Sequence, residues 1–196
     1  MNGDVAPALA LRTLPYLQGY PEPLRQQALH LLESGRLGAV LSERYGAAHG
    51  IVSDKALYQL VMAIKKERLR SAEAIDKVAF DSRIHVLKHA LGTHTAISRV
   101  QGGKLKAKRE IRVASLFRAV PLPFLEMIVV HELAHVRHVA HDKAFYQLCR
   151  HLQPDYHQVE FDLRLYLTYL DSGAAPLWRH DACVGNQIKI KRPADC

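Results

Sequence analysis

The sequence of 196 residues contains no apolar run of the roughly 18 residues that a membrane-spanning helix needs. Its first dozen residues have no basic segment ahead of an apolar stretch, which argues against a signal peptide. The three cysteines form no Cys-x-x-Cys pair and are odd in number, which favours reduced thiols over a disulfide framework. These absences predict a cytoplasmic protein with no membrane association.

Acidic residues are outnumbered by basic ones. Lys and Arg total 27 against 19 Asp and Glu, which gives a net charge of +8 and a pI of about 9.5. Such a balance suits polyanionic partners such as nucleic acid or nucleotides, although small cytosolic proteins are also basic for solubility alone. The length allows one well-buried core. We predict one domain over residues 14–170, with terminal extensions at 1–13 and 171–196.

The spacing of apolar residues changes twice along the chain. Residues 22–45 and 53–70 have the spacing of amphipathic helices, residues 74–113 alternate with the period of two that indicates strands, and helical spacing returns over 123–170. Helices, then a hairpin sheet, then helices predict the α+β class. The alternating pairs are Val78/Phe80, Ile84/Val86, Thr95/Ile97 and Ile111/Val113, with a hairpin turn expected at Gly102–Gly103.

One helical stretch carries the pattern His-Glu-x-x-His. His131 and His135 are four residues apart, so both imidazoles lie on one face of a helix and can reach one tetrahedral metal ion. Glu132 is placed to act on a water molecule without binding the metal itself. This is the zinc metallohydrolase signature, and the apolar run before it predicts a buried active-site helix.

A catalytic zinc ion needs a third protein ligand and keeps a fourth position open. His141 is our choice, and it requires the chain to turn near residues 139–140. Glu160 is the competitor, but it stands four residues before Arg164 and can instead form a helical ion pair. Tyr156 is a candidate for stabilising charge on the attacked group, and a buried aromatic role is at least as compatible with its position.

Several segments together resemble the YgjP-like metallopeptidases, and the resemblance spans about residues 14–170. It implies a minimal zincin-like domain with a small, mostly antiparallel sheet, one Zn²⁺ per chain on His131, His135 and His141, and Glu132 as general base. The family implies either a metallopeptidase or a nucleotide hydrolase that converts UTP to UMP and diphosphate. The segments are LPYLQGYP (14–21), LGTHTAISRVQGGKLKAKREIRVASLF (91–117), HELAHVRHVAHDKAFYQLC (131–149) and PDYHQVEFDLRLYLT (154–168).

Basic residues alternate along one predicted strand. Lys104, Lys106 and Lys108 share one face, and Arg99 on the paired strand can add to it. We expect this basic stripe to bind phosphates of a nucleotide or a nucleic acid near the mouth of the active-site cleft of the zincin-like domain. The alternative is a solvated face with no partner.

Other functions therefore stay open beside a peptidase or a UTP pyrophosphatase. One is a protease that acts on DNA-bound proteins. The other is a nucleic-acid-binding module with a structural zinc, against which Glu132 argues, because a structural site has no use for a base.

Overall fold

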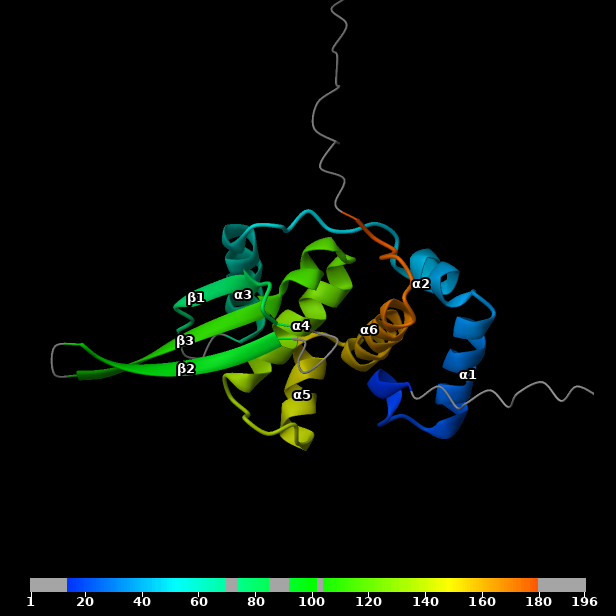
Figure 1. Cartoon of the computed structure of the whole chain (residues 1–196). Coiled ribbons are helices and arrows are strands. Elements are labelled where there is room, and N and C mark those ends of the chain that lie inside the picture. Colours follow the sequence, from blue (N-terminus) through cyan, green and yellow to red (C-terminus); the bar gives the residue numbers. More distant parts are fainter. Residues whose placement is uncertain (1–13, 70–73, 85–91, 102–103, 180–196) are drawn as a thin grey trace, which may run out of the picture.

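The computed structural model describes residues 14–69, 74–84, 92–101 and 104–179, with the backbone alone described over 92–101 and 104–108. Helices come first, then strands, then helices again, so the predicted α+β class is confirmed (Figure 1). The elements are η1 (Pro15–Leu17), α1 (Glu22–Glu33), α2 (Leu37–Tyr45), α3 (Asp54–Arg68), β1 (Lys77–Asp81), β2 (Gly92–Gln101), β3 (Lys104–Ala114), η2 (Ser115–Ala119), α4 (Leu122–His135), α5 (Lys143–Leu152) and α6 (Tyr156–Asp171).

The three strands form one sheet in the order β1-β3-β2. The longer pairing, β2 with β3, is antiparallel and runs from Gly92 opposite Val113 to Gln101 opposite Lys104. The shorter pairing, β1 with β3, is parallel. Alternation did not predict this direction, because parallel and antiparallel strands share the same period of two. The hairpin of β2 and β3 reaches beyond the helices (Figure 1).

Two details of the predicted strands differ from the structure or are not tested by it. Ile84 follows β1 without belonging to a strand. Val86 and the expected turn at Gly102–Gly103 lie outside the described residues.

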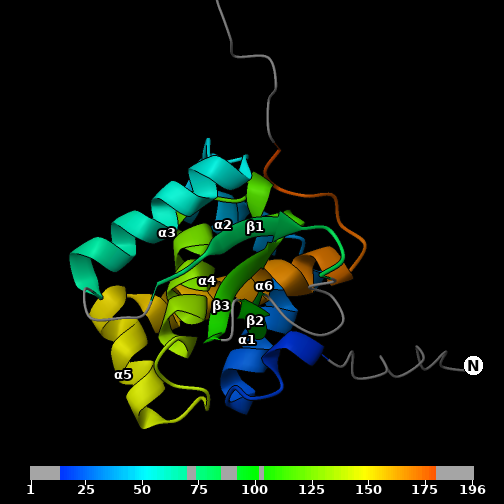
Figure 2. The ribbon, with the colours of Figure 1, turned by 90° about the vertical axis from the view of Figure 1, so that its left-hand side faces the viewer.

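Helix α4 is the centre of the molecule. It packs against α3, α5, α6 and the sheet, while α3 lies along β1 (Figure 2). A helix that is apolar all round must be covered all round, which explains why the segment around the His-Glu-x-x-His pattern lies so deep. Its buried residues are Phe124, Leu125, Met127, Ile128, Val129, Val130, Glu132, Leu133 and Ala134.

The hydrophobic core continues past the predicted end of the domain. Trp178, within the expected C-terminal extension, is only 5% exposed and packs its ring against Phe124 and Tyr166. Within the described ranges, no helix is both long enough and apolar enough to cross a membrane.

Candidate metal centre

Three imidazoles meet at the C-terminal end of α4. His131 and His135 lie in the last turns of this helix, and His141 follows on the loop that leads to α5. The Nε2 atom of His131 is 3.2 Å from that of His135 and 3.1 Å from that of His141. One nitrogen from each of the three residues lies within 4.8 Å of the others, so the group can hold a metal ion.

A hydrogen bond on the other side of the His135 ring shows that its Nε2 atom is available to a cation. Nδ1 of His135 lies 3.0 Å from the main-chain carbonyl oxygen of His138. A carbonyl oxygen only accepts, so this Nδ1 carries the proton and Nε2 of the neutral ring carries a lone pair. Lone pairs that converge at about 3 Å repel one another unless a cation lies between them. Two nitrogens on a tetrahedral ion at 2.0–2.1 Å would be about 3.3 Å apart, close to the spacing found.

The charge state of the imidazoles also suits metal binding. Burial, followed by the charges of His135 and His141, lowers the pKa of His131 to about 3. Burial likewise lowers the pKa of His135. Both rings are therefore neutral near pH 7, which is the form that binds metal.

Glu132, the next residue along α4, is 1% exposed. Its Oε2 atom has no hydrogen-bond partner among the described residues. Burial raises the pKa of this carboxyl group to about 8. A cation bound by the neighbouring imidazoles would lower that pKa again by electrostatic attraction, and so would return the group to its basic, ionised form.

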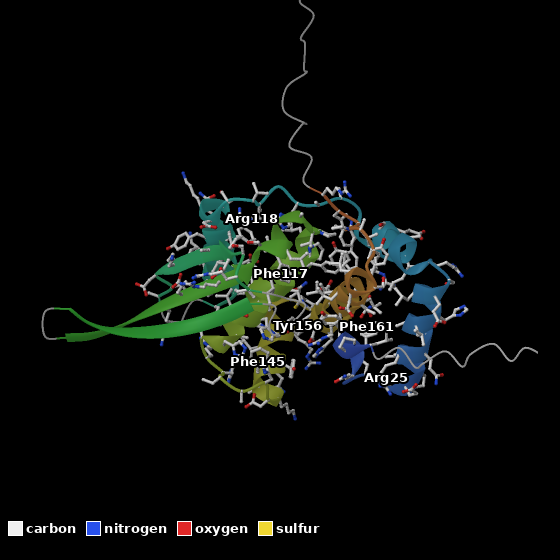
Figure 3. The ribbon with its side chains drawn as sticks, viewed as in Figure 1. Arg25, Phe117, Arg118, Phe145, Tyr156 and Phe161 are labelled. Carbon is white, nitrogen blue, oxygen red and sulfur yellow. The ribbon has the colours of Figure 1, made fainter. Side chains whose placement is uncertain are left out.

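Two aromatic side chains enclose the imidazoles from the following helices. The ring centroid of Phe145 lies 5.0 Å from that of His131 and 4.7 Å from those of His135 and His141. Tyr156 is fully buried, and its hydroxyl is 2.8 Å from Nδ1 of His131; both aromatic residues are labelled in Figure 3. Tyr156 is thus placed to orient His131, a role that its sequence position did not reveal, while stabilisation of charge on the attacked group stays a prediction.

The competing third ligand lies elsewhere. Oε1 of Glu160 is 2.8 Å from Nη2 of Arg164, in the helical ion pair that its spacing predicted. Among the described residues, the histidine group does not include Glu160, whereas it includes His141. The main-chain carbonyl of His138 also takes part in the centre, because it contacts Nδ1 of His135. The sequence could not indicate this role, since every residue has a main-chain carbonyl.

The basic stripe is described only through its backbone. Lys104 pairs with Gln101 and Lys106 with Arg99, while the side chains of these residues and of Lys108 lie outside the described part. Lys104 begins β3 and lies nine residues before Val113. At 3.3 Å per residue, the two residues are about 30 Å apart along the strand. Its binding role stays a prediction.

Comparison with known proteins bears on the whole arrangement. The model of the family described as "YgjP-like, metallopeptidase domain" matches residues 65–166. The chain is 59% identical over 163 residues to the UTP pyrophosphatase of Escherichia coli (strain K12), covering 83% of this chain and 98% of that protein. No solved structure matches it significantly. The resemblance seen in the sequence is confirmed: the chain belongs to the YgjP-like metallopeptidase domain family and is a hydrolytic enzyme.

Proposed function

We propose that this chain is a zinc-dependent hydrolase that converts UTP to UMP and diphosphate. The observation that carries the proposal is the convergence of the Nε2 atoms of His131, His135 and His141 beside the buried Glu132. The substrate is argued from the 59% identity to a UTP pyrophosphatase, of which the match covers 98%. A cytoplasmic location, expected from the free thiols, suits a nucleotide substrate.

The donor set favours zinc. Imidazole nitrogens are common zinc ligands, and three protein ligands with an open fourth position are typical of catalytic sites. We therefore infer that His131, His135 and His141 hold one zinc ion per chain. Bound there, zinc would supply Lewis acidity that makes a water molecule nucleophilic near neutral pH and polarises a phosphoryl oxygen.

The protein residues perform the remaining steps. A water molecule attacks the α-phosphorus of UTP, and the ionised carboxylate of Glu132 accepts the proton that this water loses. The bond between the α-phosphorus and the oxygen that bridges to the β-phosphorus breaks, and diphosphate leaves with the bonding electrons. Tyr156 holds the ring of His131 in place during the reaction, because its hydroxyl contacts Nδ1.

The same activated water can cleave a peptide bond, and the family description favours a peptidase. Zinc-loaded protein is therefore incubated with each nucleoside triphosphate and, separately, with unfolded and DNA-bound protein. We expect UMP and diphosphate from UTP, and intact protein substrates. Protein cleavage without UTP hydrolysis would instead establish the peptidase.

The metal assignment has its own measurement. Protein purified without added metal is expected to contain one equivalent of zinc, and His131→Ala is expected to lose it. A full equivalent retained by the variant would contradict the ligand set.

We also propose that the basic stripe of Lys104, Lys106, Lys108 and Arg99 binds phosphates. Replacement of the three lysines by alanine is expected to raise KM for UTP with little change in kcat, because each lost cation weakens only binding. Unchanged KM would leave the stripe as a solvated face. Binding to DNA that weakens steeply with salt would identify nucleic acid as its partner.

A further inference from the structure

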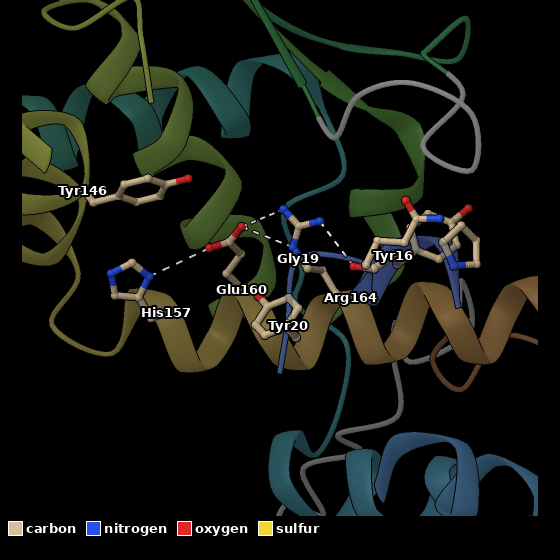
Figure 4. Close-up of a pocket in the computed structure, with 9 residues that line it drawn as sticks. Tyr16, Gly19, Tyr20, Tyr146, His157, Glu160 and Arg164 are labelled. Atoms are coloured by element: carbon tan, nitrogen blue, oxygen red, sulfur yellow. Dashed lines mark hydrogen bonds and ion pairs between the residues drawn. The ribbon is translucent and has the colours of Figure 1, made fainter. Parts of the chain in front are cut away.

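A cavity of about 300 Å³ lies between the segment around η1 and one face of α6 (Figure 4). This volume is at the lower end of small-molecule sites. The cavity is lined from η1 and the turn after it by Tyr16 and Tyr20, from α5 by Tyr146, and from α6 by His157, Glu160 and Arg164.

The cavity adjoins the metal centre. The ring of Tyr146 lies 6.3 Å from the ring of His141 and 5.4 Å from that of His157. Tyr156, which contacts His131, stands four and eight residues before Glu160 and Arg164 on α6. At 1.5 Å per residue, Glu160 and Arg164 lie about 6 and 12 Å along the helix from Tyr156. One elongated ligand can therefore reach both places.

The charges in the cavity cancel. Arg164 donates from Nη2 and Nε to Oε1 of Glu160, at 2.8 and 3.2 Å. This pair supplies one positive and one negative charge, and the tyrosines are uncharged because burial raises the pKa of Tyr20 to about 12 and that of Tyr146 above its usual value. Such a site suits a neutral polar group better than a triphosphate, whose negative charge Glu160 would repel.

The ion pair nevertheless keeps unused hydrogen-bonding capacity. Both donors from Arg164 go to Oε1, so Oε2 of Glu160 meets only Nδ1 of His157 within the described part of the chain, at 3.9 Å. That distance exceeds a hydrogen bond. Arg164 also donates from Nη1 to the main-chain carbonyl of Tyr16 at 3.4 Å and hydrogen-bonds with the side chain of Tyr20, which leaves one of its five N–H groups unused among the described residues. An acceptor and a donor thus stand side by side at the cavity.

We propose that this cavity binds the base of the nucleotide and selects uracil, with Oε2 of Glu160 accepting from the N3–H of the base and Arg164 donating to its neighbouring carbonyl oxygen. The inference rests on the proposed function and names the selective residues of that site. The rings of Tyr20 and Tyr146 supply apolar walls for the planar base. Cytosine has an unprotonated N3 at the same place, so its lone pair would face the carboxylate and the base would be rejected.

The test measures binding, without turnover, by calorimetry on the zinc-loaded full chain. UMP is expected to bind at least about tenfold more tightly than CMP, the value of one hydrogen bond to a charged group. N3-methyl-UMP, which lacks the N–H, is expected to bind about tenfold more weakly than UMP. Because this comparison changes the ligand, it does not depend on whether any variant folds.

Glu160→Gln is expected to reduce the preference for UMP over CMP to less than about threefold, because the amide can either accept or donate. The control is Glu43→Gln, which alters an exposed carboxylate on α2 away from the cavity and should keep the wild-type preference. Retention of the preference in Glu160→Gln would overturn the proposal, as would equal binding of UMP and CMP to wild type. Equal binding together with UTP hydrolysis would leave the proposed function standing. Selective UMP binding without UTP hydrolysis would support the base site and contradict the proposed function.

Discussion

Glu132 and Asp162 are two carboxylates with the same exposure, 1% each, and opposite surroundings. Asp162 accepts from Nη1 of Arg44 and the hydroxyl of Tyr45, each at 2.7 Å, and from Nε2 of Gln158 at 3.2 Å. Glu132 leaves Oε2 without a partner among the described residues, and burial raises its pKa to about 8. The two carboxylates are thus equally buried and differ in their hydrogen bonds. Asp162 is hydrogen-bonded and joins helices, whereas Glu132 keeps an oxygen atom that is available for chemistry.

The largest expected effect is on turnover. Glu132→Gln should lower kcat for UTP by about 10³-fold, because the amide cannot accept the proton of the attacking water. Zinc content should stay at one equivalent and the free energy of unfolding should not fall, since the replaced group has an orphaned oxygen to begin with. Activity that survives this change would contradict the role of Glu132 as base.

The opposite result is expected for the other carboxylate. Asp162→Ala should lower the free energy of unfolding by about 2–4 kcal/mol, because the hydroxyl of Tyr45 and the guanidinium of Arg44 lose their shared acceptor. Urea unfolding measures this change, and kcat per folded molecule should stay the same. Asp171→Asn, at the exposed end of the same helix, is the control and should leave stability nearly unchanged. A loss of kcat without a loss of stability in Asp162→Ala would reverse the comparison.

A smaller effect, on zinc affinity, is expected when the neutral hydroxyl of Tyr156 is removed from beside the metal centre. Tyr156→Phe removes the hydroxyl that contacts Nδ1 of His131 and should weaken zinc binding by about tenfold, as measured by competition with a chelator. Tyr166→Phe, at another fully buried tyrosine of α6, should leave zinc affinity unchanged. Equal affinities in both variants would show that Tyr156 does not orient the ligand.

The smallest effect concerns an exposed carboxylate that makes one hydrogen bond within the described part of the chain. Oδ1 of Asp142 accepts from the main-chain N–H of Phe145 at 2.9 Å and caps the start of α5. Asp142→Ala should cost about 1 kcal/mol of stability. Asp142→Ser should recover most of it, because the hydroxyl also caps; failure to do so would indicate that charge matters more than the cap.

Local spacing accounts for what the sequence predicted. His131 and His135 face one point because a helix places residues four apart on one side, and His141 is only six residues further along the chain. Their position together is found in the structure, while their role as zinc ligands stays a prediction. The α+β class followed in the same way from changes of period.

Long-range contacts account for what the sequence could not predict. The parallel direction of β1 and β3, the Arg44–Asp162 pair across 118 residues, and the contact between Arg164 and Tyr16 across 148 residues leave no local period. The cavity between η1 and α6 is built from such a contact, so neither Tyr20 nor Tyr146 could be singled out before the fold was known.

The position of His141 on a loop would set the order in which the proposed ligands release and take up a metal ion. Two of the proposed ligands are fixed on a buried helix, whereas the third is exposed on a loop that also carries Val139, a residue that is 90% exposed. Dissociation would therefore begin when the loop withdraws His141, with the helical pair releasing the ion last, and uptake would follow the reverse order. The rate at which the enzyme gains or loses its ion would then depend on the opening of a seven-residue segment, 136–142, without unfolding of α4.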